Sequence, residues 1–218
     1  MVILENVTKI YQSRGGQVKA LDNVNLRVER GEFVVIRGPS GSGKTTLLLI
    51  VGGMLDPTAG KVIVDGVDLT SISERARAKF RGQNIGFVFQ MFHLVPYLNV
   101  IENVLLAGGA KGGNVDRERA RALLKRLGLA EREQHKPSQL SVGERQRTAI
   151  ARALFNQPKL ILADEPTGNL DPDSAKEVFR YLREFREEGG TVLVVTHGVE
   201  VDKYADRILQ LRNGRLSV

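Results

Sequence analysis

The chain has 218 residues, 42% of them hydrophobic, which is enough for one domain with a sizeable core, with or without a subdomain. It contains no cysteine, which excludes disulfide bonds and cysteine-based metal sites. The formal net charge is +7, but the basic residues are dispersed, and their local concentration at 117–126 has no interleaved aromatics, so we expect a solvated surface and no nucleic-acid partner. The longest apolar stretch, at 47–55, is far shorter than the roughly 20 residues that span a bilayer. We therefore expect a soluble chain, with any membrane-spanning helices supplied by another chain.

The first part of the chain mixes antiparallel strands with one buried strand and its helix. Alternating apolar and polar residues predict strands at 2–11 and 24–28, and a continuous apolar run predicts a buried strand at 33–37. Residues 44–51 favour a helix directly afterwards. Asp65-Gly66, between apolar residues at 61–64 and 67–69, is a strong signal for a two-residue hairpin turn.

The second part of the chain is first mostly helical and then alternates strand and helix. The predicted elements are a strand at 85–90, helices at 100–106, 115–127 and 142–156, a strand at 159–163, a helix at 174–188, a strand at 191–196, a short helix at 199–204 and a strand at 207–211. A flexible loop is expected at 108–113, and a hairpin turn at Asn213-Gly214. This alternation predicts an α/β fold with a largely parallel sheet covered on both faces.

One segment matches the phosphate-binding pattern G-x-x-x-x-G-K-[ST] completely, between a predicted strand and a predicted helix. Its residues are Gly38, Pro39, Ser40, Gly41, Ser42, Gly43, Lys44 and Thr45, and Thr46 after them is also expected to contact the nucleotide. The glycines allow backbone N–H groups to turn toward phosphate oxygens, and the following helix points its positive end at the same anion. Lys44 would contact the β- and γ-phosphates, and Thr45 would bind Mg²⁺ through its hydroxyl.

Two carboxylates follow the buried strand at 159–163, at the sheet edge where ligands bind in parallel sheets. Asp164 would hold Mg²⁺ through water, and Glu165 would polarise the water that attacks the γ-phosphate. The alternative is that a carboxylate here only caps the next helix. That account is weaker, because a proline and a glycine turn delay the next helix until after Pro172.

Two further polar residues end predicted strands. His197 follows the strand at 191–196, and its place in a fold that carries a triphosphate site favours a functional over a structural role. Gln90 ends the strand that begins at residue 85, and its amide would reach Mg²⁺ or the attacking water. A merely polar strand end is the alternative for Gln90, and spacing does not decide between the two.

The segment Leu140-Ser141-Val142-Gly143-Glu144 contains the capping box S-x-x-E at the start of the helix at 142–156. Ser141 would be the N-cap, and Glu144 would reach back to the backbone N–H of Ser141. Such a helix start presents backbone donors and a positive dipole end, although many helices have such a cap.

Taken together, these motifs resemble those of an ABC transporter ATPase domain, over essentially the whole chain. The matching segments, in order, are 38–45, Gln90, 140–144, 160–165, Leu170-Asp171 and His197. The resemblance implies the P-loop NTPase fold of ABC ATPases, with a mostly parallel core sheet, an antiparallel β subdomain and an inserted helical subdomain. It implies one domain over 1–218, with the core at 1–90 and 157–218 and the helical subdomain at 91–156.

The resemblance also implies roles for single residues. Gln90 would be the Q-loop glutamine, which links the nucleotide to the transmembrane partner. Asp171 would be the D-loop aspartate at a dimer interface, and His197 the switch histidine that contacts the γ-phosphate. Tyr11 is placed like the aromatic residue that stacks on adenine, with a core or surface tyrosine as the alternative.

The segment at 140–144 resembles the LSGGQ signature, which acts on the nucleotide of a partner subunit. Val142 stands where the signature has a glycine, and Glu144 where it has a glutamine. As the first helical residue, Val142 would cost only roughly a few tenths of a kcal/mol in helix propensity. Ser141, Gly143 and Glu144 are therefore expected to meet the ATP of a second copy.

The run at 164–171 and the short chain resemble the MacB, LolD and FtsE branch, whose members serve lipoprotein release, macrolide or peptide efflux, and cell division. The implied function is an ATP-binding and hydrolysing subunit with ATP and Mg²⁺ as cofactors. It would dimerise on ATP and drive a separate transmembrane permease from the cytoplasmic face of the cell membrane, for export, lipoprotein release or mechanical work on the envelope.

A soluble ABC ATPase in an assembly or scaffold complex is the alternative. Its DNA-repair and chromosome members carry long coiled coils, and no sustained heptads separate Thr45 from Leu160 here. A non-hydrolysing regulatory cassette is disfavoured, because Lys44, Asp164, Glu165 and His197 are all present.

Overall fold

The computed structural model describes residues 1–13, 16–111 and 116–217. Within these ranges the strands form a four-stranded sheet in the order β2-β1-β4-β5 and a six-stranded sheet in the order β10-β9-β3-β8-β7-β6. The strands are β1 (Val2–Ser13), β2 (Gly16–Val28), β3 (Phe33–Arg37), β4 (Ala59–Val64), β5 (Val67–Asp68), β6 (Ile85–Phe89), β7 (Leu160–Asp164), β8 (Thr191–Thr196), β9 (Arg207–Arg212) and β10 (Arg215–Ser217). The first sheet is antiparallel, whereas β3, β6, β7, β8 and β9 run parallel in the second.

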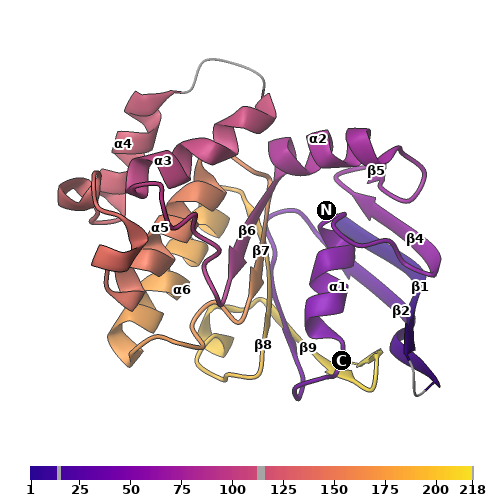
Figure 1. Ribbon diagram of the computed structural model, residues 1–218. Helices are drawn as coiled ribbons and strands as arrows, with labels where there is room; N and C mark the ends of the chain where they lie inside the picture. Colours follow the sequence, from indigo (N-terminus) through magenta and orange to yellow (C-terminus); the bar gives the residue numbers. More distant parts are fainter. Residues whose placement is uncertain (14–15, 112–115, 218) are drawn as a thin grey trace.

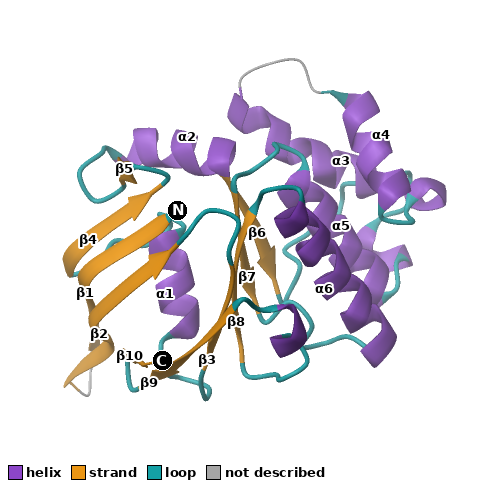
Figure 2. Ribbon diagram, turned by 180° about the vertical axis from the view of Figure 1, so that it is seen from behind, coloured by secondary structure: helices purple, strands orange, loops and turns teal. Residues whose placement is uncertain are grey.

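The helices cover both faces of the six-stranded sheet. They are α1 (Lys44–Val51), α2 (Glu74–Asn84), α3 (Val100–Leu105), α4 (Arg117–Arg126), α5 (Val142–Leu154) and α6 (Pro172–Glu187), with 3-10 turns η1 (Leu106–Lys111), η2 (Ala130–Arg132), η3 (Pro137–Gln139) and η4 (Asp202–Tyr204). Helix α1 lies between the two sheets, and α3, α4, α5 and α6 lie on the other side of the six-stranded sheet (Figures 1 and 2). Within the described ranges, no helix combines the length and apolar character needed to cross a membrane.

Alternate side chains of each parallel strand pack into two different cores. In β3, Phe33 and Val35 belong to the core beneath α3, α4, α5 and α6, whereas Val34 and Ile36 belong to the core shared by α1 and the antiparallel sheet. Because both faces are buried, the strand is a continuous apolar run rather than an alternating one. The loop at 38–43 follows the carboxyl end of β3. Because β3, β7 and β8 are parallel, the residues that follow β7 and β8 lie at the same edge of the sheet.

The predicted α/β fold with a largely parallel, doubly covered sheet is confirmed, and several element bounds agree closely. The strands at 33–37 and 191–196 and the helix at 44–51 have the predicted bounds. The hairpin at Asp65-Gly66 is present, with φ of 50° and 81° and with Val64 paired to Val67. These φ values suit the primed turn that matches the twist of two paired strands.

The sequence prediction omitted α2. No residue of this helix is buried, so it lacks the apolar stripe on which the prediction relied. Its start is marked instead by Ser73, whose side chain accepts a hydrogen bond from the N–H of Ala76. Strand β2 begins at Gly16, whereas the prediction placed its start at residue 24. The prediction missed the first residues because they are exposed and are held by pairing with β1.

Two other expectations need correction. The helix predicted at 199–204 is only the short 3-10 turn η4. The loop expected at 108–113 belongs to η1 as far as residue 111, and its remaining two residues lie outside the described ranges.

Candidate nucleotide-binding site

The phosphate-binding segment connects the carboxyl end of β3 to the start of α1 and is packed closely between two neighbouring strands. Gly43 has φ of 104°, and a Cβ atom there would lie 2.3 Å from the carbonyl oxygen of Ala20 in β2. A Cβ atom at Gly38 would lie 2.1 Å from the carbonyl oxygen of Leu211 in β9. Both positions therefore require glycine, and the path of the loop is set by its surroundings.

Lys44 directs a nearly buried ammonium group into this loop. Its Nζ donates to the carbonyl oxygens of Gly38, at 2.8 Å, and Pro39, at 3.1 Å, and lies 3.7 Å from Oε1 of Glu165. The residue is only 7% exposed. A compact positive charge held at this point, beside the amino end of α1, suits an anion such as phosphate.

Thr45 and Asp164 bring two oxygen ligands together from separate elements. The Thr45 hydroxyl donates to Oδ2 of Asp164 at 2.8 Å. The other oxygen of Asp164, Oδ1, is buried and has no hydrogen-bond partner within the described residues. Burial raises the pKa of Asp164, while the Thr45 hydrogen bond opposes this shift. A carboxylate oxygen without a partner beside a hydroxyl is the kind of oxygen pair that Mg²⁺ prefers.

The carboxylate of Glu165 is held by the residues that end β8. Thr196 donates its hydroxyl to Oε2 at 2.7 Å, and the backbone N–H of His197 donates to the same oxygen at 3.2 Å. The Nδ1 atom of His197 lies 2.9 Å from Oε1. Glu165 itself has φ of 44°, in the left-handed region, and its N–H donates to the carbonyl of Val195 at 2.9 Å. The structure thus brings two predicted residues, Glu165 and His197, into direct contact and adds a third, Thr196, that the prediction omitted.

Tyr11 lies beside the beginning of α1. Its hydroxyl is 3.5 Å from Oγ1 of Thr46, and the Nζ of Lys9 is 5.3 Å from the centre of its ring. The side chain is 39% exposed, so a ring face is accessible next to the phosphate-binding segment. An exposed aromatic ring in this place can stack on a nucleobase.

Gln90 follows β6 and contacts the loop after Glu165 rather than the Thr45–Asp164 pair. Its Nε2 atom is 3.5 Å from Oδ1 of Asn169, and a Cβ atom at Gly168 would lie 2.8 Å from Nε2. In the part of the chain that the structure describes, no hydrogen bond joins Gln90 to Thr45 or Asp164. Gln90 is therefore placed at the border of the site.

The capping box predicted at the start of α5 is present. The N–H of Glu144 donates to Oγ of Ser141 at 3.2 Å, and the N–H of Ser141 donates to Oε2 of Glu144 at 2.8 Å. Arg132 donates to the other carboxylate oxygen at 2.8 Å, and these contacts lower the pKa of Glu144. Val142 is the first helical residue and is 41% exposed, as its position in the capping box predicts.

Ser141, Gly143, Glu144 and Asp171 form a second group of predicted residues. A Cβ atom at Gly143 would lie 2.8 Å from Oγ of Ser174 on α6. Asp171 caps α6 by accepting from the N–H groups of Asp173 and Ser174, and these hydrogen bonds lower its pKa. Within the described ranges, no hydrogen bond or ion pair links this group to residues 38–45. Helices α1 and α5 lie on opposite sides of the six-stranded sheet (Figures 1 and 2), so the two groups of residues form two separate surfaces of the chain.

Two polar side chains on α5 link it to the loops around the site, and the prediction omitted both. Gln146 is fully buried, and its Nε2 donates to the carbonyl of Pro166 at 2.6 Å. Arg152 donates to the carbonyls of Phe92 and His93, each at 2.6 Å, and burial lowers its pKa. In the sequence, each of these is a polar residue on the apolar face of a predicted helix. Such a position shows that the side chain needs a hydrogen-bond partner, but it does not show which residue that partner is.

Comparisons with known proteins identify the family of this chain. A family described as ABC transporter matches residues 21–168. The uncharacterized ABC transporter ATP-binding protein MJ1508 of Methanocaldococcus jannaschii is 47% identical over 99% of this chain and 97% of its own length. The lipoprotein-releasing system ATP-binding protein LolD of Hyphomonas neptunium is 46% identical over 98% of this chain and 95% of its own length.

A solved structure is similar over the whole chain. It is the dimeric, post-hydrolysis state of the ATP-binding cassette MJ0796 bound to ADP and Pi, with a TM-score of 0.94 and 43% identity, covering 100% of this chain and 97% of that one. The fold and the ATP chemistry implied by the motifs are thereby confirmed. The chain belongs to the ABC transporter family, as an ATP-binding and ATP-hydrolysing subunit with the ABC ATPase fold.

Proposed function

We propose that two copies of this chain hydrolyse ATP at their shared interface. Each ATP is held by residues 38–45 of one copy and by residues 141–144 of the other. The observation that carries this proposal is the separation of the two surfaces within one chain, since each presents the start of a helix, α1 or α5, and neither surrounds a nucleotide alone. The dimeric form of the similar cassette MJ0796 supports it.

Within each composite site, the chain's own groups have distinct tasks. Lys44 and the N–H groups of the loop bind the phosphates, and Tyr11 stacks on the adenine ring. Glu165 orients the attacking water and accepts its proton, while His197 contacts the γ-phosphate and keeps the Glu165 carboxylate in place.

Mg²⁺ would be held by the oxygen pair formed by Thr45 and Asp164, and the amide of Gln90 would have to turn from Asn169 to reach it. When bound, the ion neutralises negative charge on the phosphate oxygens. Thr45 and Asp164 would hold the ion between the phosphate-binding segment and Glu165. Their contribution is therefore to align the phosphates with the water held by Glu165.

A separate transmembrane permease is the partner that we propose for this dimer. The segment after Gln90 exposes large apolar side chains, with Met91 70% exposed and Tyr97 75% exposed. Close by, a cavity of about 230 Å³ is lined by Phe87, Phe89 and other residues at the border of the parallel sheet and α5. We propose that these exposed apolar side chains form the contact with the permease. The chain would thus act at the inner face of the membrane in export or lipoprotein release, as the relative named LolD suggests.

Mixing two inactive variants tests the composite site. Lys44→Ala disables the first surface in both sites of a dimer, and Ser141→Arg disables the second. A mixed dimer has one site with both defects and one intact site, so ATP hydrolysis should rise above that of either variant alone. If the mixture hydrolyses ATP only at the mean rate of the two separate variants, the composite site is wrong.

Docking to a membrane protein distinguishes the transporter from a soluble assembly complex. The variants Met91→Asp and Tyr97→Asp should lose co-purification with an integral membrane protein from detergent-solubilised membranes. Val18→Asp, at a 54% exposed position on β2, is the matched control and should retain it. Binding that all three variants retain would contradict this docking surface.

A further inference from the structure

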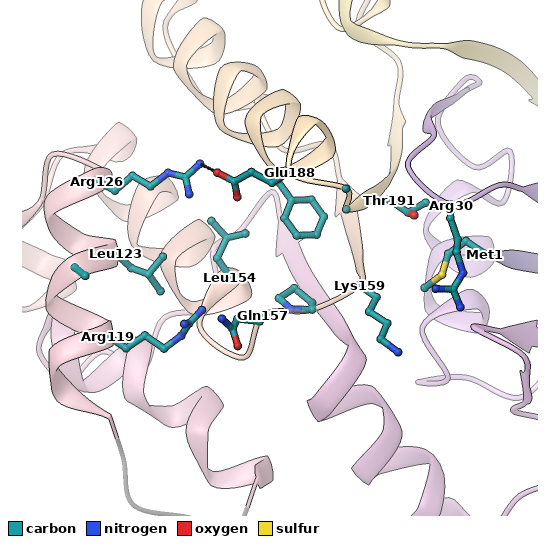
Figure 3. Close-up of a pocket in the computed structure, with 15 residues that line it drawn as sticks. Met1, Arg30, Arg119, Leu123, Arg126, Leu154, Gln157, Lys159, Glu188 and Thr191 are labelled. Atoms are coloured by element: carbon teal, nitrogen blue, oxygen red, sulfur yellow. Dashed lines mark hydrogen bonds and ion pairs between the residues drawn. The ribbon is translucent and has the colours of Figure 1, made fainter.

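A cavity of about 620 Å³ lies at the edge of the parallel sheet opposite the nucleotide motifs (Figure 3). It is lined by residues just before β7 and at the start of β8, including Lys159 and Thr191, whereas the nucleotide motifs follow the other ends of these strands. One wall is helix α4, and the opposite wall includes Met1 and Arg30. Its volume is in the range that accommodates small molecules.

The interior of this cavity is apolar. Leu123 of α4, Leu154 of α5 and Phe185 of α6 contribute side chains, and Pro158 lies in the loop before β7. In Figure 3 Leu123 lies between Arg126 and Arg119 along α4, and Leu154 lies beside Leu123 toward the middle of the cavity. A ligand here would therefore bury an apolar body of moderate size.

Most cations around this cavity are already paired. Arg126 donates to Glu188 at 2.7 Å, and Lys159 lies 2.7 Å from Oδ2 of Asp65. Arg30 also pairs with Asp65. The terminal nitrogen of Arg126 also lies 3.2 Å from Oε2 of Glu184, so these three cations are balanced by three carboxylates.

Arg119 differs from these cations because no carboxylate among the described residues pairs with it. Its Nε donates to the carbonyl of Phe155 at 2.7 Å, which fixes the position of the guanidinium group. Within the described residues, its two terminal nitrogens form no hydrogen bond and no ion pair. Two parallel N–H donors of this kind match the oxygens of a carboxylate or phosphate group.

We propose that this cavity binds a small amphipathic anion, with an apolar body between α4, α5 and α6 and one carboxylate or phosphate group on Arg119. Such a ligand touches the carboxyl end of α5, whose amino end is the capping box at Ser141. It lies away from the nucleotide, so both ligands bind to the same chain at once. The site is thus a second small-molecule site, independent of the one that binds ATP.

Calorimetry with the full chain tests this site, in the presence of saturating ADP and with ligands below their micelle-forming concentrations. Decanoate and decyl phosphate are the two anionic probes, and they separate a carboxylate from a phosphate preference. Decanol and decyltrimethylammonium, with the same apolar chain, are the uncharged and cationic controls. We expect one equivalent of at least one anion to bind, at least about tenfold more tightly than either control, which corresponds to about 1.4 kcal/mol.

Three variants locate the binding. Arg119→Gln should weaken anion binding at least tenfold, whereas Arg117→Gln, on the same helix and outside the cavity, should leave it unchanged. Ala122→Phe fills the cavity from an exposed position, so it should abolish binding while the chain stays folded even if Arg119→Gln does not.

The proposal is overturned if decanol binds as tightly as the anions, if ADP displaces them, or if the Arg119 and Arg117 variants behave alike. Failure of both anions to bind would also overturn it. None of these results depends on ATP hydrolysis, so they do not test the composite ATP site.

Discussion

The carboxylate of Glu165 and the imidazole of His197 meet across the ends of two neighbouring strands, with Oε1 2.9 Å from Nδ1. The second carboxylate oxygen is occupied as well, by the hydroxyl of Thr196 and the backbone N–H of His197. The direction of the Glu165 side chain is therefore set by β8, although Glu165 itself follows β7. This cross-strand support is what a residue that orients a water molecule requires.

Replacement of Glu165 by glutamine keeps the size of the side chain and removes the charge. We expect Glu165→Gln to bind ATP normally but to hydrolyse it at least about 100-fold more slowly, because the proposed general base is lost. ATP-bound dimers should then accumulate. Phosphate release and gel filtration with ATP measure both effects, and Glu200→Gln, an exposed carboxylate nearby, is the control. Undiminished hydrolysis in the Glu165 variant would remove it from the proposed role.

Thr196→Val tests how the Glu165 carboxylate is held in place, and it leaves the other residues that contact this carboxylate, Lys44 and His197, unchanged. Thr196 is only 4% exposed, so the isosteric valine keeps the packing and deletes the hydrogen bond to Oε2 together with the one that the hydroxyl accepts from the N–H of Gly198. We expect a loss of about 1–2 kcal/mol in the free energy of unfolding. The rate of hydrolysis at saturating ATP should fall, with little change in the affinity for ATP. An equal effect on affinity and rate would instead indicate a general structural role.

Arg152 should stabilise the loop after Gln90. Both carbonyls that it contacts belong to residues with positive φ, Phe92 at 57° and His93 at 49°. We expect Arg152→Gln to lower the free energy of unfolding by about 2–3 kcal/mol, because hydrogen bonds from a charged group are lost. Arg152→Lys should not restore stability, since an ammonium lacks the fork that reaches two carbonyls. Denaturant unfolding measures both variants, and full rescue by lysine would contradict this account.

The pair formed by Glu144 and Arg132 should make stability depend on pH. Arg132 and the N–H of Ser141 lower the pKa of Glu144 in the folded chain below its ordinary value of 4.5. The ionised form therefore favours folding, and its contribution is present above about pH 4.5 and is lost as the pH falls through the lower, folded pKa.

Unfolding of the wild type and Glu144→Gln between pH 7 and pH 3 measures this contribution. The wild type should be more stable at pH 7, and the difference should shrink below about pH 4.5. Glu131→Gln, an exposed carboxylate on η2, is the control and should show no such trend. A difference for Glu144→Gln that stays constant over this range would rule out the proposed linkage.

Local sequence patterns predicted those parts of the fold and of the site that depend only on residues close together in the chain. The apolar run of β3, the glycines at 38–43 and the capping box at Ser141 each depend on neighbouring residues, and all appear where they were expected. Helix α2 could not be found in this way, because none of its residues is buried. The helix propensity of its residues and the Ser73 N-cap can be read from the sequence, but they are weaker signals of a helix than a periodic apolar pattern.

Contacts between distant residues were the other part that the sequence could not supply. Thr196 is 31 residues from Glu165, and Gln146 is 20 residues from Pro166. Such pairs depend on which strands become neighbours in the sheet and on how α5 packs against it. Periodicity in one segment carries no information about either.

The left-handed backbone of Glu165 has a consequence for the order of the two acidic residues. Successive side chains of a strand point to opposite faces, so two adjacent carboxylates would ordinarily serve different sides of the sheet. Because the chain turns at Glu165, with φ of 44°, its side chain reaches Lys44 and His197 while Asp164 reaches Thr45. One irregular dihedral angle thus lets two consecutive residues contribute side chains to the same proposed ATP site.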